Sequence, residues 1–582
     1  MDKYAIAMVL EEIATLLEAS GENRFKARAF RSAARALEKA ERDPRALLAS
    51  DSLRALPGIG PATARIIEEL VVTGESSYLL ALRERAPSGM RELLRVPGLG
   101  PKKIAQLYGE LGIADLDALE AAAHSGRIAA VRGFGARTQQ RVLEGIAFAR
   151  GLAGRRRYHE AEAAALRLAG FLDEIPGIER TYIGGALRRG LEIVDGIVLV
   201  SVLSVSPGRI AARIRAAAGL TWYEGDDRTI RGRFGDGLSV EVCLAEPDRL
   251  GAVLLHTTGS AAHIDAVAAV AVGRGLVLTP DGLRDGGELL RASTEDAIYE
   301  ALALQPVPPE LRETGEEVAL AREHALPRLV EPDDLRGCFH CHTTHSDGRA
   351  SVEEMAEGAL ALGWQYLGIA DHSRNAGYAG GLQLAQIRRQ HREIDAWNRH
   401  RGRELRLLKG IEADILADGS LDYSADAGVL ESFDFVIGSV HSLFRTERKA
   451  MTKRIERAVS DPRLTMLGHA TGRLLLIRDG YDVDLDAVID RAAECGVAIE
   501  INADPHRLDM SWQHWPRARA LGVRTAINPD AHSVSALRVV RYGVGIARKA
   551  WLTTDHVINA WPLEDVEQYL DERKQRRSGK AS

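Results

Sequence analysis

Histidines and carboxylates that can bind metal ions recur at regular intervals through the C-terminal half of the chain. His340 and His342 form the first pair, at alternate positions of a segment, 339–343, that predicts a strand. The period of two places both imidazoles on one face of this strand and Cys341 on the other. Two imidazoles on one face can bind one cation, but H-x-H pairs also arise by chance in a chain with 17 histidines. The pair indicates a metal site only if further ligands accompany it.

Further candidate ligands stand at the ends of seven predicted strands. These strands are expected near 338–343, 366–370, 405–412, 433–438, 464–468, 497–502 and 523–528, separated by helices such as 351–362 and 384–398. This alternation is typical of a parallel βα barrel, in which functional groups gather at the C-terminal ends of the strands. The residues at these ends are His340, His342, Asp347, Asp371, His372, Glu412, Asp414, His441, His469, Glu500, Asp504, Asp530 and His532. So systematic a set favours a metal cluster over histidines that only satisfy hydrogen bonds in a core.

A cluster of mixed imidazole and carboxylate ligands has a definite chemistry. It suits manganese, zinc or iron better than calcium or magnesium. Clustered metals lower the pKa of a bound water and neutralise a phosphate, so hydrolysis of a phosphoester is the expected reaction. Arg374 and Arg473 each follow a strand end and are candidate phosphate contacts, although a structural ion pair explains either residue equally well.

Length and composition bound the remaining possibilities. A chain of 582 residues predicts several domains. A net charge of −6 excludes a uniformly basic nucleic-acid coat and leaves only local basic faces for DNA. Four cysteines at uneven spacing give no disulfide framework and fit a reducing cytoplasm. No apolar run approaches membrane length, so we expect a cytoplasmic protein without a signal peptide. We also expect the protein to be a monomer.

A glycine-containing turn repeats three times near the N-terminus, before predicted helices. Its copies are L-P-G-I-G-P at 56–61, V-P-G-L-G-P at 96–101 and, more weakly, V-R-G-F-G at 131–135. Glycine permits a tight turn and close backbone approach, and the N–H groups of the helix start can bind a phosphate. The repeats resemble tandem helix-hairpin-helix elements, which implies DNA binding without base specificity. The candidate contacts are Gly58, Gly60, Gly98, Gly100, Lys102, Lys103, Gly133 and Gly135.

Residues 1 to about 315 resemble a bacterial family X DNA polymerase. The resemblance rests on G-A-L-R-R-G at 185–190, T-T-G-S at 257–260, and the segments 295–299 and 308–311. It implies an α+β nucleotidyltransferase-like palm and thumb. In the family, the turn at 185–190 holds the triphosphate, and a D-x-D pair plus a third aspartate on neighbouring strands hold two metals.

The chain departs from this family at the catalytic carboxylates. Alignment of the turn and Glu192 places Gly196 and Val198 at the D-x-D positions and Glu241 at the third aspartate. Asp195 does not replace either aspartate, because a shift of one residue turns the faces of the strand over. The degenerate polymerase site therefore comprises Gly185, Ala186, Arg188, Arg189, Gly196, Val198 and Glu241.

Residues 334 to 570 resemble the PHP (polymerase and histidinol phosphatase) domain, through H-x-H-T-x-x-S-D-G, D-H-S, G-I-E, V-H-S, G-H and D-A-H. The resemblance implies a distorted (β/α)7 barrel with two or three divalent ions, manganese or zinc, with iron also possible. It assigns His340, His342, Glu412 and Asp530 to one ion. Glu412 bridges to a second ion on His441 and His469, and a third lies on Asp347, His372 and His532.

The predicted organisation has seven parts. They are a helical DNA-end-binding domain (1–85), a second helix-hairpin-helix region (86–154), a degenerate palm (155–238), the palm end and thumb (239–315), a linker (316–335), the PHP domain (336–570) and a basic tail (571–582).

The predicted function is DNA repair. The barrel would act as a metal-dependent phosphodiesterase or 3′–5′ exonuclease at DNA 3′ ends. Its substrates would be gapped or 3′-end-containing duplexes, and the polymerase core would bind DNA without catalysis. Two alternatives stay open. One is an active polymerase and exonuclease with an unusual metal site built from Glu192, Asp195 or Glu241, and the other is a non-catalytic DNA-binding scaffold. A small-molecule phosphatase is disfavoured because it leaves the glycine repeats without a purpose.

Overall fold

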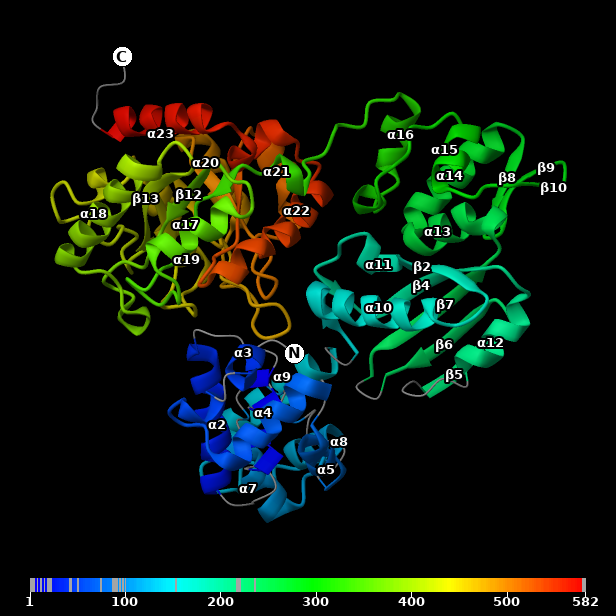
Figure 1. The fold of residues 1–582 in the computed structure, drawn as a ribbon, viewed down its shortest axis with the longest axis horizontal. Coiled ribbons are helices and arrows are strands. Elements are labelled where there is room, and N and C mark those ends of the chain that lie inside the picture. Colours follow the sequence, from blue (N-terminus) through cyan, green and yellow to red (C-terminus); the bar gives the residue numbers. More distant parts are fainter. Residues whose placement is uncertain are drawn as a thin grey trace. The chain divides into compact units, whose positions relative to one another are not determined.

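The chain forms two compact units, Met1–Ala153 and Gly154–Ser582 (Figure 1). The computed structural model describes residues 6–577 apart from 8, 11–12, 15, 18–23, 41–43, 50–51, 74–75, 86–92, 94–95, 97–98, 100, 152–153, 216–220 and 235–236. Within these residues, no helix is both long enough and apolar enough to cross a membrane.

The first unit is helical. Its helices are α2 (Arg24–Lys39), α3 (Pro44–Ala49), α4 (Pro61–Thr73), α5 (Ser77–Arg85), α7 (Pro101–Leu111), α8 (Leu116–His124) and α9 (Ala136–Gly151). The helices enclose two apolar cores, one within residues 6–82 and one within 93–149. Two separate small cores are the packing expected of two successive helical modules.

The second unit begins with a five-stranded sheet in the order β2-β4-β7-β6-β5. The strands are β2 (Ile178–Gly184), β4 (Gly196–Leu203), β5 (Thr221–Gly225), β6 (Thr229–Arg233) and β7 (Ser239–Ala245), and the short β1 (Arg156–Arg157) and β3 (Ile193–Val194) pair beside them. Strands β4 and β7 are parallel, whereas the other neighbours are antiparallel. Helices α10 (Tyr158–Asp173) and α12 (Pro207–Arg215) share an apolar core with this sheet. This is the predicted palm.

A small helical and hairpin region follows the palm. It contains α13 (Leu250–Thr258), α14 (Ala261–Gly273), β8 (Leu276–Thr279), β9 (Gly282–Asp285), β10 (Glu288–Leu290), α15 (Glu295–Ala301) and α16 (Glu316–Arg322). Strands β8, β9 and β10 form an antiparallel sheet. One core joins α13 to α15, in the predicted thumb, with α16, which lies in the predicted linker (316–335). The start of that linker is therefore packed as a helix on the thumb.

The C-terminal part is a seven-stranded parallel sheet in sequential order. Its strands are β11 (Gly337–Cys338), β12 (Tyr366–Ile369), β13 (Arg406–Asp414), β14 (Phe435–Ser439), β15 (Met466–Leu467), β16 (Ala498–Asn502) and β17 (Thr525–Asn528). A parallel bridge between Cys341 and Ala531 joins the first strand region to the last, which nearly closes the barrel. The predicted fold class, with helical modules, an α+β palm and thumb, and a distorted barrel, is confirmed.

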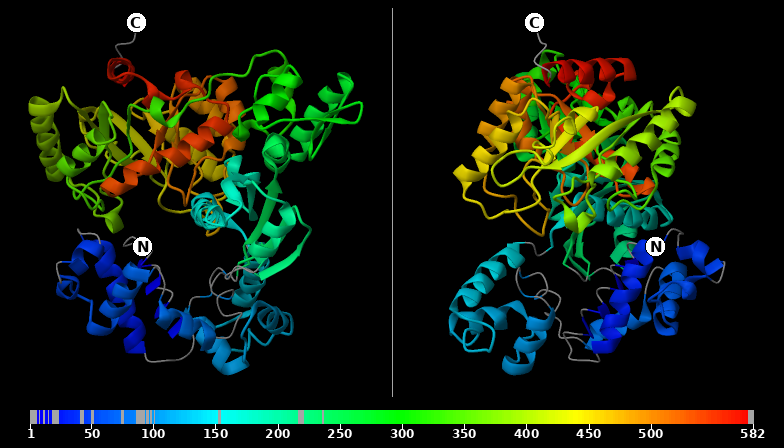
Figure 2. Two further views of the ribbon diagram at one scale, coloured as in Figure 1. Left: turned by 45° about the vertical axis from the view of Figure 1, so that its right-hand side comes forward. Right: turned by 90° about the vertical axis from the view of Figure 1, so that its left-hand side faces the viewer.

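Helices cover the outside of this barrel (Figure 2). They are α17 (Val352–Leu360), α18 (Leu384–Arg401), α19 (Arg448–Val459), α20 (Leu485–Cys495), α21 (Trp515–Ala520), α22 (Val540–Lys549) and α23 (Leu563–Arg577). Most strand residues are buried on both faces, as is typical of parallel sheets covered by helices.

The first strand is shorter than predicted. Regular pairing ends at Cys338, whereas the sequence predicts a strand through Thr343. Beyond this point Phe339 donates its N–H to the side chain of Asn528 at 2.9 Å, and the carbonyl of Cys341 accepts from Ala370 at 2.8 Å. A side-chain acceptor therefore replaces one backbone acceptor of the sheet, and regular strand pairing does not continue past Cys338.

Candidate metal centre

All nine predicted ligands lie at the C-terminal ends of the barrel strands, and seven of them form three overlapping groups; the other two lie beside these groups, His469 at 3.0 Å from Glu412 and Asp530 at 3.1 Å from His342. The groups are His340, His342 and Glu412; His372, Glu412 and His441; and His342, Asp347, His372 and His532. Within each group the potential ligand atoms lie within 4.8 Å of one another. The barrel fold thus brings together residues that lie up to about 190 positions apart in the sequence, as is typical of such barrels.

Glu412 lies at the centre of the cluster. Its carboxylate is fully buried at the end of β13 and lies 2.8 Å from His372 Nδ1, 3.0 Å from His469 Nε2 and 3.3 Å from His441 Nε2. One carboxylate within reach of imidazoles from several strands can bridge two cations. This position matches the bridging role that the sequence resemblance implies.

Two outer carboxylates hold imidazoles in place. His340 Nδ1 lies 2.7 Å from Glu500, and His441 Nδ1 lies 2.7 Å from Asp414. These contacts leave the Nε2 atoms facing Glu412. His340 Nε2 is buried without a hydrogen bond among the described residues, 3.5 Å from Glu412 and 3.6 Å from Asp530. A metal ion satisfies such an orphaned nitrogen, so the residues fit the implied metals.

Two of the predicted ligands have an unusual backbone conformation. Asp530 has φ +51° and His469 has φ +24°, in or near the left-handed region that costs a non-glycine residue about 1–2 kcal/mol. Asn502 Nδ2 donates to the Asp530 carboxylate at 3.1 Å, and the N–H of His469 donates to Glu500 at 2.7 Å. The surrounding hydrogen bonds therefore hold both side chains in conformations that the free chain avoids.

The electrostatics of the cluster are those of strongly coupled buried groups. Burial and the neighbouring His532 and His372 lower the pKa of His342 to about 3. Burial also lowers the pKa of His532 and His441, but carboxylates outweigh it and raise them to about 9 and about 10. Burial raises the pKa of Glu412, yet the facing imidazoles hold it well below its usual value. The carboxylates are therefore ionised near neutral pH, as metal ligands must be.

Asp371 is a strand-end carboxylate outside the nine. It accepts from the N–H and hydroxyl of Thr343 at 2.7 and 2.6 Å, from Gln390 at 2.5 Å and from the Ser346 hydroxyl. These bonds fix the turn that carries Asp347. Asp371 thus positions a ligand.

Both arginines proposed as phosphate contacts make ion pairs. Arg374 lies 3.1 Å from Asp422 and 2.6 Å from Asp426, and it stacks on Tyr423. Arg473 lies 2.8 Å from Glu192 of the palm. The sequence left a structural ion pair as the alternative to a phosphate contact, and the contacts of Arg374 and Arg473 are such ion pairs.

Arg507 is a cation that the sequence analysis missed. It follows β16, and its Nε lies 3.8 Å from Asp530 Oδ2. Within the described residues its guanidinium donates no hydrogen bond to the protein. Burial lowers the pKa of Arg507, but Asp530 and Asp504 outweigh it and raise the pKa. The signal in the sequence was its place three residues after the strand-end Asp504.

Cys338 and Cys341 stand in a C-x-x-C spacing that the sequence analysis passed over. Their sulfur atoms lie 3.4 Å apart, and both side chains are fully buried. They pack in an apolar core with Met355, Trp364 and other side chains. The pair is part of the barrel's packing and not of the ligand set.

The predicted polymerase site contains few carboxylates. Val198 stands opposite Glu241 in the sheet, and its methyl groups lie against Gly185, where an added Cβ would come within 2.9 Å. Gly196 has little space for a side chain, because a Cβ would lie 3.0 Å from the Ser239 carbonyl. Glu241 is paired with Arg231 at 2.9 Å.

The predicted triphosphate turn is engaged in ion pairs. Arg188 lies 2.5 Å from Glu295 and donates to Thr258 Oγ1 at 3.0 Å. Arg189 lies 2.8 Å from Glu313 and donates to the carbonyl of Thr258 at 2.7 Å. Ala186 in the same turn is partly buried and offers no hydroxyl to a ligand.

The glycine turns of the first unit are only partly described. Gly58 and Gly133 have φ +97° and +89°, so these positions need glycine. Gly60 and Gly135 directly precede α4 and α9. Lys103 lies 5.7 Å from the centre of the Phe134 ring. Gly98, Gly100 and the side chain of Lys102 lie outside the described residues.

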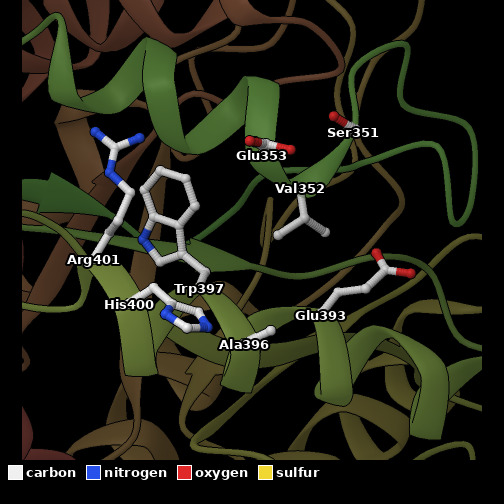
Figure 3. A pocket seen from close by; sticks show the side chains of 8 residues that line it. All are labelled: Ser351, Val352, Glu353, Glu393, Ala396, Trp397, His400 and Arg401. Atoms are coloured by element: carbon white, nitrogen blue, oxygen red, sulfur yellow. The ribbon is translucent and has the colours of Figure 1, made fainter.

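A pocket of about 420 Å³ lies away from the nine ligands, between the start of α17 and the second half of α18. Figure 3 shows the carboxylates of Glu353 and Glu393 and the indole of Trp397 around it. Glu393 also lies 2.8 Å from His345. None of the nine ligands lines this pocket.

Models of four protein families match parts of the chain. They describe a helix-hairpin-helix domain (1–76), a SAM-like helix-hairpin-helix tandem (90–147), a DNA polymerase beta thumb (253–313) and a PHP domain (339–504). The chain is also similar to the DNA polymerase/3′-5′ exonuclease PolX of Bacillus subtilis, with 36% identity over 98% of this chain and 99% of that protein. The chain belongs to the PolX family. The C-terminal part alone is similar to probable phosphatases of Thermoanaerobacter sp. and Caldanaerobacter subterraneus, each 26% identical over 41% of this chain and 96% or 92% of theirs. The family and its helix-hairpin-helix domains indicate DNA binding, and the PHP domain indicates dependence on metal ions.

Proposed function

We propose that the barrel of this PolX-family protein hydrolyses phosphoesters at DNA 3′ ends and that its polymerase core binds DNA without polymerising nucleotides. The observation that carries the first half is the cluster around Glu412. Nine predicted ligands from six strand ends gather there, and buried carboxylates hold the outer nitrogens of His340 and His441. The relative in Bacillus subtilis is named as both a polymerase and an exonuclease.

The proposed ligand sets are those that the resemblance implies, with two or three ions of manganese or zinc, or of iron. When bound, such ions supply a hydroxide near neutral pH and neutralise the phosphate. The protein's own residues hold the site in shape. Glu500 and Asp414 orient His340 and His441, and Asp371 fixes the turn of Asp347. Arg507 provides a positive charge at Asp530 that can face a phosphate oxygen.

The second half of the proposal rests on the palm. Two-metal nucleotidyl transfer needs several carboxylates that face one point. Here Val198 fills the space beside Gly185, and Glu241 is neutralised by Arg231. Arg188 and Arg189, the expected triphosphate contacts, are already paired with Glu295 and Glu313. We therefore assign the core a binding role and keep an active polymerase as the alternative.

We further propose that the protein acts as a monomer on gapped or 3′-ended duplexes, independently of base sequence. We base this on the glycine turns predicted from the sequence, because contacts from backbone N–H groups to phosphates would carry no base information. We also propose the domain boundaries predicted from the sequence, except that α16 (Glu316–Arg322) belongs with the thumb, whose core it shares.

Hydrolysis can be tested on labelled 3′-recessed, 3′-phosphate and abasic duplexes with manganese or zinc. Wild-type protein should degrade or trim at least one of them, and Asp530→Ala and His342→Ala should be at least 100-fold slower. Equal degradation by all three proteins would exclude the barrel as the nuclease. Separately, primer extension with manganese and four nucleotides should give no product, and efficient incorporation would refute the inactive core.

A further inference from the structure

One segment of the barrel, residues 504–509, joins the metal centre to the palm. It follows β16 and carries Arg507, which lies 3.8 Å from the ligand Asp530. The N–H and carbonyl of Asp509 pair with Asn502 at the end of β16. The carboxylate of Asp509 accepts from the N–H of Thr471 at 3.0 Å. The segment is thus held from the strand on one side and from the loop after β15 on the other.

Arg473, in the loop after β15, connects this segment to Glu192 of the palm. Its Nε donates to the carbonyl of Arg507 at 2.9 Å, and its Nη2 donates to the carbonyl of Leu508. The same guanidinium lies 2.8 and 3.4 Å from the two oxygens of Glu192. Both side chains are largely buried, with 16% and 13% exposed. A two-sided, mostly buried contact of this kind fixes orientation as well as position.

A second palm contact reaches the same segment. His159, in the first turn of α10, packs against His506 with ring centroids 5.1 Å apart. The backbone of α10 is itself tied to Glu192, because Tyr158 donates its N–H to the Glu192 carbonyl at 2.9 Å. The two contacts therefore come from one corner of the palm and converge on residues 506–508.

We propose that the palm is a brace for the metal centre, and that Glu192 and Arg473 are positioning residues that set Arg507 beside Asp530. The inference rests on the proposed hydrolysis at the barrel. It gives the palm a use that does not require polymerase carboxylates. Loss of the Glu192 charge leaves Arg473 largely buried beside carbonyls alone, so its guanidinium must seek water or another partner. The carbonyls of Arg507 and Leu508 then lose their fixed donor, and Arg507 loses its fixed place.

The chain offers matched controls. Glu162 of α10 pairs with Arg541 of the barrel at 2.7 Å, and Glu310 pairs with Arg548 at 2.7 Å. In both pairs the arginine lies on α22 of the barrel, and the glutamate lies outside the barrel. Among the described residues, neither pair makes a hydrogen bond to the segment 504–509. Glu162→Gln therefore removes the same charge from a neighbouring part of the palm without releasing Arg473.

The test compares Glu192→Gln, Glu162→Gln and Arg507→Met with wild type in the full chain, together with the double variant Glu192→Gln/Arg507→Met. The substrates are a 3′-recessed duplex and bis(p-nitrophenyl) phosphate, a small phosphodiester that needs no DNA-binding domain. We expect Glu192→Gln to lower kcat/KM about tenfold on both substrates, mainly through kcat, and Glu162→Gln to change it less than twofold. The double variant should be no slower than Arg507→Met, because Glu192 acts only by positioning Arg507 and its loss has no further effect once Arg507 is gone.

Hydrogen exchange of the backbone amides gives a readout that does not depend on activity. Amides of residues 504–509 should exchange at least tenfold faster in Glu192→Gln than in wild type or Glu162→Gln, at an unchanged thermal midpoint. Equal exchange in the two glutamine variants, or multiplicative losses in the double variant, would overturn the brace. If wild type turns over neither substrate, the proposed hydrolysis fails, and the exchange measurement still decides whether the palm fixes this segment.

Discussion

Replacement of Glu500 by glutamine tests whether His340 is a metal ligand. Glu500 is fully buried at the end of β16, and its Oε1 lies 2.7 Å from His340 Nδ1. It also accepts from the N–H of His469 at 2.7 Å, from Asn528 Nδ2 at 3.0 Å and from Asn502 Nδ2 at 3.3 Å. The carboxylate therefore accepts at both oxygens from buried donors, whereas a glutamine can accept at only one.

The expected effect follows from these contacts. In Glu500→Gln, the new amide N–H₂ must face either His340 and Asn528 or the N–H of His469, so at least one buried donor loses its acceptor. Such a loss costs about 1–3 kcal/mol. Outer carboxylates of metal-bound histidines are worth 10- to 100-fold in metal affinity or activity, which is about 1.4–2.7 kcal/mol. We expect a loss in this range for both quantities.

The measurement is a competition titration of manganese or zinc against a chelator of known affinity, with kcat determined on the same samples. Glu494→Gln is the matched control, since Glu494 is an exposed partner of Arg491 on α20. Unchanged metal affinity in Glu500→Gln, with the protein folded, would refute the claim that Glu500 orients a ligand.

Three further predictions follow from the same geometry. Arg507→Met should lower kcat/KM on DNA about 10- to 100-fold and leave the metal affinity unchanged. A steady-state assay paired with the chelator titration measures both, and a kcat/KM equal to that of wild type would show that Arg507 does not act at the site. Metal binding should release protons, because the pKa values of His441 and His532, about 10 and about 9, keep both imidazoles protonated at pH 7. Calorimetry in buffers of different ionisation enthalpy should detect this release, and the affinity for the metal should fall as the pH is lowered from 8 to 6. Burial lowers the pKa of His391 to about 4, so its contribution to stability is complete above pH 6.5 and is lost as the pH falls toward 4. In urea unfolding, the free energy of unfolding of His391→Gln should therefore fall less between pH 7 and pH 5 than that of wild type. Equal losses would contradict the assignment.

The place of the candidate ligands was predictable because the period of strands and the barrel rule act on residue types alone, whereas the choice of nine among them came from the resemblance to the PHP domain. His340, Glu412 and Asp530 could be placed at one end of the barrel without coordinates, since each ends a strand. The rule does not separate ligands from their supports. Asp371, Asp414 and Glu500 also end strands, and only the distances show that they face hydroxyls or the outer nitrogens of imidazoles.

Contacts between distant segments were beyond the sequence. Arg473 and Glu192 are 281 positions apart, and no local pattern pairs them. Arg507 follows its strand by five residues, outside the strand-end positions that the rule collects. The early end of β11 depends on the Asn528 side chain, which replaces a backbone acceptor and comes from β17, the last strand of the sheet, 189 positions away in the sequence.

The central claim is that the chemistry of this PolX-family protein lies in the barrel and not in the palm. The most direct test uses one 5′-labelled primer in a gapped duplex, incubated with manganese and all four nucleotides, for wild type and Asp530→Ala. The account predicts that wild type only shortens the primer and that Asp530→Ala leaves it unchanged. A lengthened primer with wild type, or undiminished shortening with Asp530→Ala, would contradict it.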